Sequence, residues 1–276
     1  MSGLAELSER FIRFKEISDI MTAMKSLSLV ETHKLARFIE HQRRMLANIA
    51  AAASDFLHFL PAAASEKQPT ILLLIGSERG FCGNFNERVL AGLEALPQWE
   101  TPLTLLTVGQ RLGAKLEAHP SVVANLEGAT VTEGVPAVLN RLMDALHATS
   151  TDISAHGAAL YSLAHAADGE IELKRVLPLA PPQPPPLSHP PRLQLPPAEF
   201  FAELLDHYLL AVLHGLLYES LAAENRQRLA HMEHALHRLE ERVARLALKR
   251  NALRQEKIIE EIEVILSSEQ AFAKAN

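Results

Sequence analysis

Cysteine is nearly absent from this 276-residue sequence: Cys82 is the only one. A single cysteine excludes an intramolecular disulfide and a cysteine-built zinc site, and it fits a reducing compartment. A basic excess is also missing, since 27 Lys and Arg stand against 33 Asp and Glu, which argues against a nucleic-acid binder. No apolar run approaches the roughly 20 residues that cross a bilayer, and the first residues do not have the pattern of a signal peptide. We therefore expect a soluble cytoplasmic protein, which could still attach to a membrane complex through protein contacts.

Aromatic residues make up only 5% of the chain, and glycine and proline are missing from two long intervals. These intervals lie between Gly3 and Pro61 and between Gly215 and Asn276. Helices of ordinary domains average about 11 to 12 residues, so each interval predicts a helix too long for a compact globule.

Apolar residues recur at steps of three and four in both intervals, with a period near 3.5. Such a narrow seam is typical of a coiled coil and needs a partner helix. An antiparallel pair between the two ends of one chain would supply it, and a parallel homodimer would serve equally well; we favour the intramolecular pair because the two patterns differ. The seam residues include Phe11, Phe14, Ile17, Met21 and Met24 in the first interval, and Leu229, Met232, Leu236, Leu239, Leu253, Ile258, Ile262 and Ile265 in the second.

The middle of the chain, residues 69–177, alternates short apolar runs with helical patterns, which predicts a Rossmann-like α/β domain with a mostly parallel sheet. Strands are expected at 70–75, 103–108, 122–124, 158–165 and 170–177, and helices at 84–96, 110–118 and 135–148. The domains are therefore an N-terminal helix (1–60), this α/β domain, a proline-rich linker (178–197) and a C-terminal helix (198–276). We interpret the linker as a semi-rigid spacer and keep a docking motif for a proline-binding module as the alternative.

Candidate chemistry is sparse in this sequence. The glycine-containing loop 76–86 follows the first expected strand, where phosphates often bind, but its spacing fits neither nucleotide fingerprint, so we favour a structural turn. Cys82 could be a nucleophile, although a buried inert thiol is the better interpretation. His231, His234 and His237 could bind a metal, but their spacing favours solvated side chains. We predict a non-catalytic protein with no cofactor and no metal.

Three stretches of the sequence resemble the gamma subunit of the rotary ATP synthase. The segment Ile17–Lys25 resembles the family's "KITKAM" helix segment, and Ser77–Asn86 resembles its "S-x-RGLCG-x-x-N" loop. Residues 219–228 resemble "E-x-L-A-S-E-x-x-x-R", and residues 251–262 resemble "N-x-x-RQ-x-x-I-T-x-E-L". Order and spacing agree along nearly the whole chain.

The resemblance implies a central shaft that transmits torque between an ion-driven ring of c subunits and the catalytic beta subunits. It implies alpha, beta and epsilon subunits as further partners, no nucleic acid and no direct insertion into the membrane. The expected location is the cytoplasmic face of the bacterial inner membrane. By family analogy, we expect Arg254 and Gln255 to form hydrogen bonds with a loop of a beta subunit, and Glu261 to contribute near the tip of the helix pair. The same analogy implies that Met24 packs in the opposing helix and that Ile262, Ile265 and Leu266 form an apolar bearing.

Several positions depart from the family pattern, among them Thr22, Ser26, Leu27, Gln194 and Ile259. These departures resemble the alternative, sodium-linked bacterial variety of the enzyme. Two other functions stay open on the residues alone. One is a coiled-coil scaffold or adaptor with an α/β interaction domain, and the other is a small-molecule enzyme centred on Cys82 or the glycine loop.

Overall fold

The computed structural model describes residues 2–60, 69–96, 103–149, 158–179 and 189–275. The chain divides into two compact units, Met1–Leu27 with Ala230–Asn276, and Ser28–Leu229. Two long helices, α1 (Ser2–Phe59) and α5 (Pro197–Ala275), contribute residues to both units. The expected long helices at both ends of the chain, with an α/β domain between them, are therefore confirmed.

Helix α5 starts at the proline that the sequence marks as its boundary. Proline is favoured at the first helical position because its missing N–H would have no partner there. Phe200 N donates to Pro196 O at 2.9 Å, and Glu199 places an acidic side chain in the first turn, where the helix dipole favours it. The expected linker precedes this point, and its residues 180–188 lie outside the described residues.

A five-stranded sheet in the order β3-β2-β1-β4-β5 forms the centre of the larger unit. The first four strands run parallel, and β5 pairs with β4 in the antiparallel direction. All six residues of β1 are buried, as expected for a strand covered on both faces. The mostly parallel sheet is thus confirmed. The strands are β1 (Thr70–Ile75), β2 (Leu103–Val108), β3 (Val122–Leu126), β4 (Ala159–His165) and β5 (Ile171–Leu177).

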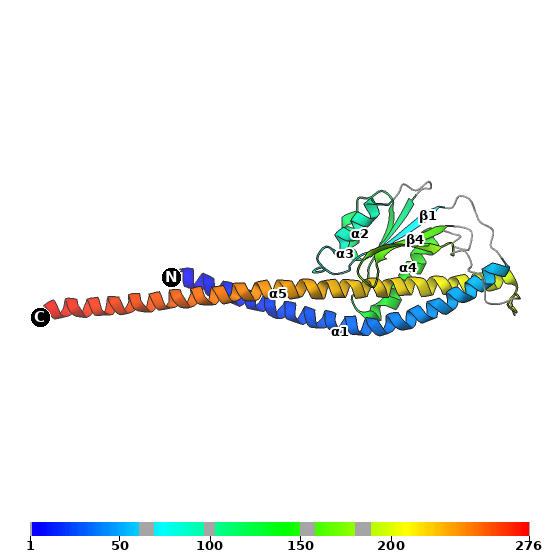
Figure 1. Cartoon of the computed structure of the whole chain (residues 1–276). Helices are drawn as coiled ribbons and strands as arrows, with labels where there is room; N and C mark the ends of the chain where they lie inside the picture. The colour runs from blue at the N-terminus through cyan, green and yellow to red at the C-terminus, as the bar shows by residue number, and fades with distance from the viewer. Residues whose placement is uncertain (1, 61–68, 97–102, 150–157, 180–188, 276) are drawn as a thin grey trace. The chain divides into compact units, whose positions relative to one another are not determined.

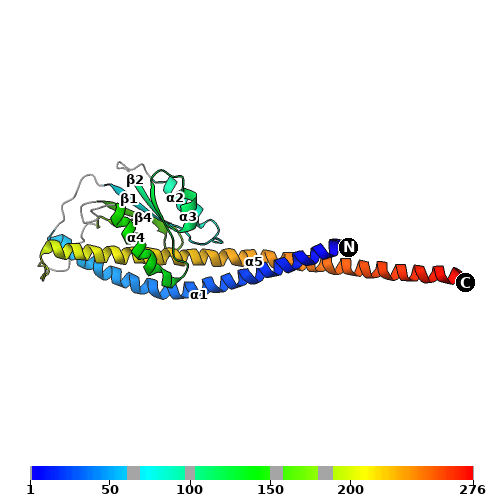
Figure 2. The same ribbon diagram turned by 180° about the vertical axis from the view of Figure 1, so that it is seen from behind.

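Helices cover both faces of the sheet (Figures 1 and 2). On one face, α2 (Phe85–Glu94) and α3 (Gln110–Leu116) pack against Leu72 and Leu74 of β1. On the other face, Leu73 of β1 shares a core with α4 (Val135–Thr149) and with buried leucines of α1 and α5. The short 3₁₀ turn η1 (Thr132–Gly134) leads into α4. One face of the sheet thus shares its apolar core with α4 and with both long helices.

Within this unit, α1 and α5 run antiparallel. Phe38 stacks on Tyr218 with ring centroids 5.4 Å apart, and Phe56 stacks on Phe201 at 5.2 Å. Gln42 Nε2 donates to a backbone carbonyl of α5 at 2.8 Å. Positions rise along α1 as their partners fall along α5, so the two helices of this one chain form the antiparallel pair that the sequence analysis favoured.

Helix α5 is also long and apolar enough, by length and composition, to cross a membrane. This is weak support for a membrane span, because a core helix passes the same test. Leu205, Leu209 and Leu213 are each no more than 3% exposed and belong to the core beneath the sheet. Burial in the α/β core accounts for these leucines.

In the smaller unit, the two helices again run antiparallel. Lys25 Nζ lies 2.7 Å from Glu233 Oε1, and the Arg250 guanidinium lies 4.6 Å from the Phe11 ring centroid. Met232 is fully buried. The seam predicted further along α5 is exposed instead, at Leu253, Ile258, Ile262 and Ile265. Helix α1 has 58 residues and α5 has 79, so α1 does not extend far enough to cover them.

Candidate subunit-contact and junction sites

The loop between β1 and α2 is held by its own side chains. Ser77 N donates to Asn86 Oδ1 at 2.9 Å, and Asn86 Nδ2 donates to Ser77 Oγ at 2.8 Å. Phe81 has φ of 65° and Gly83 has φ of 60°, so two residues adopt the left-handed conformation that shapes a tight turn. Phe81 is also 59% exposed. These features support the structural-turn interpretation of the loop.

Ligands of α/β folds usually bind at the carboxyl ends of the parallel strands. At this end of the sheet, two carboxylates of the chain itself accept hydrogen bonds from backbone N–H groups. Glu78 Oε2 accepts from Gln110 N at 3.0 Å and from Gly128 N at 2.7 Å. Glu224 Oε2 in turn accepts from Glu78 N at 3.4 Å. The N–H groups of Glu78, Gln110 and Gly128 therefore already have acceptors within the chain and are not free to hold a phosphate.

Two of the family-like stretches meet at one place, which we call the α5 junction: Glu224 and Arg228 of α5 with the loop residues Glu78 to Gly80. Glu224 and Arg228 form a buried ion pair, and Arg228 Nε donates to Gly80 O at 3.2 Å. Burial raises the pKa of the Glu224 carboxyl, while the Arg228 charge and hydrogen bond oppose that rise. The i,i+4 spacing of the pair is visible in the sequence, but its attachment to the loop is not.

A second buried carboxylate connects α1 to the α/β domain, and we call this contact the α1 junction: Glu31 with Thr132 and Lys34. Glu31 Oε2 accepts from Thr132 N and from Thr132 Oγ1, each at 2.8 Å. Lys34 Nζ lies 3.0 Å from Glu31 Oε1. Burial alone would raise the pKa of Glu31, but the hydrogen bonds from Thr132 and Lys34 lower it below its ordinary value. The sequence analysis did not single out Glu31, although a carboxylate among the apolar seam positions of α1 is a signal of a buried polar contact.

Cys82 is 5% exposed and packs with Phe85 and Ala223. Burial raises the pKa of its thiol, which disfavours the reactive thiolate. This environment supports the buried-thiol interpretation over a nucleophile. Among the described residues, no group of three or more His, Cys, Asp or Glu could hold a metal ion. His234 and His237 are exposed, as the solvated interpretation expects.

The residues assigned to subunit contacts by resemblance belong to the smaller unit, whereas both junctions belong to the larger one. Arg254, Gln255 and Glu261 are exposed on α5, and Lys257 Nζ lies 3.7 Å from Glu261 Oε1. Ile262 and Ile265 are 50% and 59% exposed. All described side chains from residue 251 to residue 266 are exposed, so this stretch has the accessibility that a contact surface needs. Met24 is half-buried on α1, and these roles stay predictions.

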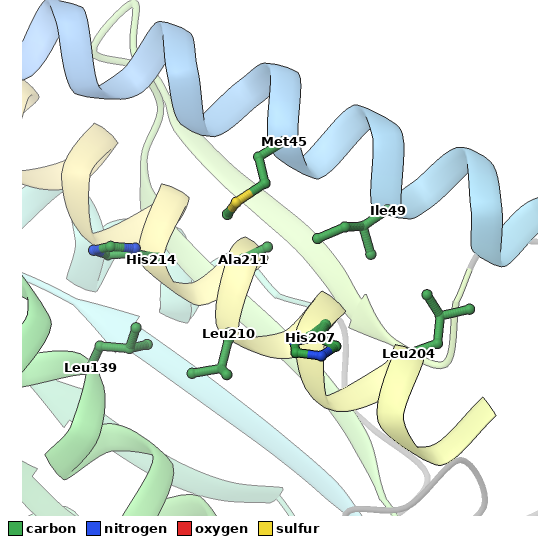
Figure 3. A pocket seen from close by; sticks show the side chains of 8 residues that line it. All are labelled: Met45, Ile49, Leu139, Leu204, His207, Leu210, Ala211 and His214. Atoms are coloured by element: carbon green, nitrogen blue, oxygen red, sulfur yellow. The ribbon is translucent and has the colours of Figure 1, made fainter. Parts of the chain in front are cut away.

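An apolar groove of about 370 Å³ lies between α1, α4 and α5, and its residues are shown in Figure 3. Met45 and Ile49 of α1 face the α5 residues across it. One lining residue, His214, has a buried Nε2 without a hydrogen-bond partner among the described residues. Burial lowers the pKa of His214, so the folded chain favours the neutral imidazole. The residues that line the groove are Met45, Ile49, Leu139, Leu204, His207, Leu210, Ala211 and His214.

We expect His214→Phe to increase the free energy of unfolding by about 1–2 kcal/mol, because it removes a buried unpaired nitrogen and keeps the ring contact with Tyr218. The gain grows as the pH falls below about 6.5, since the unfolded chain then binds a proton that folded His214 resists. Denaturant unfolding at pH 7 and pH 5.5 measures both effects. His207→Phe, at an exposed position of the same groove, is the matched control. An equal gain in the free energy of unfolding at both pH values would contradict a neutral, buried His214 in the folded chain.

Two long helices with an α/β domain inserted between them in the chain define the class of this protein. A family model described as ATP synthase matches residues 3–272. The ATP synthase gamma chain of Geotalea uraniireducens (strain Rf4) is 23% identical over 291 residues, covering 99% of both chains. That of Pelotomaculum thermopropionicum is 24% identical over 293 residues, covering 99% of this chain and 100% of the relative. The chain belongs to the ATP synthase gamma-subunit family.

Solved structures share the fold. A chain of the Euglena gracilis mitochondrial ATP synthase rotor in rotational state 1 aligns with a TM-score of 0.62 at 15% identity. The alignment covers 92% of this chain and 98% of the other. A chain from the central stalk and c ring of the Tetrahymena thermophila enzyme aligns with a TM-score of 0.53 at 16% identity, covering 78% and 99%. The architecture is thus that of central-stalk subunits.

Proposed function

We propose that this chain is the rotating central shaft of a membrane ATP synthase and has no active site of its own. The match of the family model along residues 3–272 carries the proposal. The antiparallel helices provide a stiff element, and the sheet packed on them provides a base. Membership of the family supports alpha and beta subunits around the shaft, with epsilon and the c ring at the base. The proposed location is the cytoplasmic face of the bacterial inner membrane.

Asymmetry of the helix pair explains how such a shaft would act. Each orientation of the pair presents different side chains to a surrounding beta subunit. A difference in contact free energy between orientations shifts the conformational populations of that subunit, and with them its nucleotide affinity. The exposed stretch of α5 that contains Arg254, Gln255, Glu261, Ile262 and Ile265 is the part we assign to these contacts. The sodium-linked variety of the enzyme stays a prediction.

Co-purification tests the proposal. Tagged chain from its native host, after gentle solubilisation of the membranes, is expected to recover alpha and beta ATPase subunits in fixed stoichiometry. Recovery of unrelated proteins alone would favour the scaffold or adaptor alternative. Bound nucleotide or substrate on the isolated chain would favour the enzyme alternative.

We further expect Arg254→Ala with Gln255→Ala to lower the ATP turnover of the assembled complex by about tenfold, the effect of losing about 1.4 kcal/mol of contact free energy in the rate-limiting state. Turnover per assembled complex is measured after quantifying the alpha, beta and mutant subunits on the same gel. The matched control is Arg245→Ala, an exposed arginine of the same helix. Unchanged turnover in a fully assembled double variant would remove these two residues from the contact role.

A further inference from the structure

The α/β domain is attached to the long helices by apolar packing and by two buried carboxylates. The apolar core joins Leu73 and Val138 to Leu35 and Leu213. Burial of these side chains is a large favourable term, but it has no direction and roughly follows the area removed from water. Such a contact resists separation better than it resists sliding or turning. A fixed angle between domain and helices needs directional bonds.

The α1 junction supplies such bonds on one helix. Glu31 is 2% exposed and Thr132 is 2% exposed, so water does not compete with the two hydrogen bonds at 2.8 Å. Lys34 reaches from α1 to Glu133 at 3.0 Å as well as to Glu31. Charge-assisted hydrogen bonds of this kind are about twice as strong as neutral ones and fix geometry. The turn η1, and through it α4, is thereby tied to α1.

The α5 junction supplies the second set of bonds on the other helix. Glu224 and Arg228 are 4% and 5% exposed. Glu224 accepts from Glu78 N, and Arg228 donates to Gly80 O, so both charges hold the backbone of the loop after β1. Gln227 Nε2 adds a bond to Asn84 Oδ1 at 3.1 Å. The loop leads directly into α2, so this junction ties β1 and α2 to α5.

The two junctions share a neighbour inside the α/β domain. Glu78 belongs to the α5 junction, and its carboxylate accepts from Gly128 N at 2.7 Å. Gly128 lies four positions before Thr132 of the α1 junction. Glu78 and the segment 128–132 therefore connect the two junctions through hydrogen bonds of at most 3.4 Å.

We propose that Glu31 and Glu224 are positioning residues that hold the α/β domain at a fixed angle on the helix pair and so carry torque between the two. The inference rests on the proposed function and adds the route of force within the chain. A rotating ring that pushes on the α/β domain would turn the helices through these two points. Loss of both junctions would let the domain yield under load while the apolar core still keeps it attached.

The test uses the assembled complex in inverted membrane vesicles. One variant combines Glu31→Gln with Thr132→Val, a second combines Glu224→Leu with Arg228→Met, and a third combines all four changes. ATP hydrolysis and the ATP-driven membrane potential are measured together, and the potential reports pumping of either sodium or protons. Glu87→Gln with Lys115→Met is the matched control, because this ion pair at 2.7 Å lies between α2 and α3 and touches neither long helix.

We expect the four-change variant to hydrolyse ATP while the potential generated per ATP falls to about half or less, because directional charge-assisted bonds are lost and apolar contacts are kept. Restoring Glu31 and Thr132 together recovers part of the coupling, and the control variant is unchanged. Normal coupling in the assembled four-change variant would overturn the inference. If that variant does not assemble, Glu31→Gln with Glu224→Gln keeps both shapes, and normal coupling there overturns it equally. Absence of alpha and beta subunits from wild-type preparations would instead overturn the proposed function.

Discussion

Replacing Glu224 with Ala is expected to lower the free energy of unfolding by about 3–5 kcal/mol, because the change leaves the Arg228 charge buried without its partner. Arg228 is 5% exposed, so its guanidinium cannot regain water without a rearrangement of the loop. The backbone N–H groups of Glu78 and Arg79, which donate hydrogen bonds to Glu224, would lose their acceptor as well. Chemical denaturation of the purified chain, followed by circular dichroism, measures the change.

The control for this prediction removes both charges. Glu224→Leu with Arg228→Met is expected to cost much less than Glu224→Ala alone, because replacing a buried ion pair by apolar residues of similar volume is often neutral or stabilising. Arg226→Ala, at an exposed position of the same helix, checks for loss of helix propensity. A double variant as unstable as the single one would show that the loop itself, and not the unpaired charge, depends on these side chains.

Gly109→Ala is expected to lower the free energy of unfolding by about 3 kcal/mol or more, through a strained backbone and an overlap with backbone atoms. Gly109 has φ of 106° at the end of β2. A Cβ there would lie 2.6 Å from Gly76 O and 2.8 Å from Ser77 O. Both neighbours are backbone oxygens of the loop after β1, so no side chain can move aside. Thermal unfolding by calorimetry measures the loss.

Gly169 separates the two contributions to that loss. It has φ of 90° in the turn between β4 and β5, and a Cβ there would meet nothing within 4 Å. Gly169→Ala therefore reports the left-handed conformation alone, at about 1–2 kcal/mol. The prediction for Gly109 is wrong if both variants lose the same amount, because the overlap would then contribute nothing.

Much of the fold could be predicted from the sequence, because its signals are local. The residues 70–75 and 103–108 form strands with the predicted bounds, since short apolar runs with turn residues on both sides leave few alternatives. The Asp168–Gly169 turn lies between the two strands predicted at 158–165 and 170–177, with Glu170 N donating to Asp168 Oδ1 at 3.0 Å. The two long helices follow from the missing glycine and proline.

The junctions could not be predicted, because they depend on contacts between residues far apart in the chain. Glu31 and Thr132 are 101 positions apart, and Arg228 and Gly80 are 148 apart. Composition and spacing mark Glu224 and Arg228 only as an i,i+4 pair, which on most helices is a solvated pair of small energy. The seam pattern also predicted a partner helix over Leu253 and Ile258, which are exposed, since a heptad pattern predicts that a partner exists and does not identify the molecule that supplies it.

The exposed apolar residues 264–266 of α5 affect how a cell must make this chain. Val264, Ile265 and Leu266 are each more than half exposed, and apolar surface of this kind promotes self-association when nothing covers it. The newly synthesised chain is therefore most prone to aggregation before its partner subunits bind. Balanced synthesis of the partner subunits, or a chaperone that covers residues 264–266, would protect the yield of functional molecules.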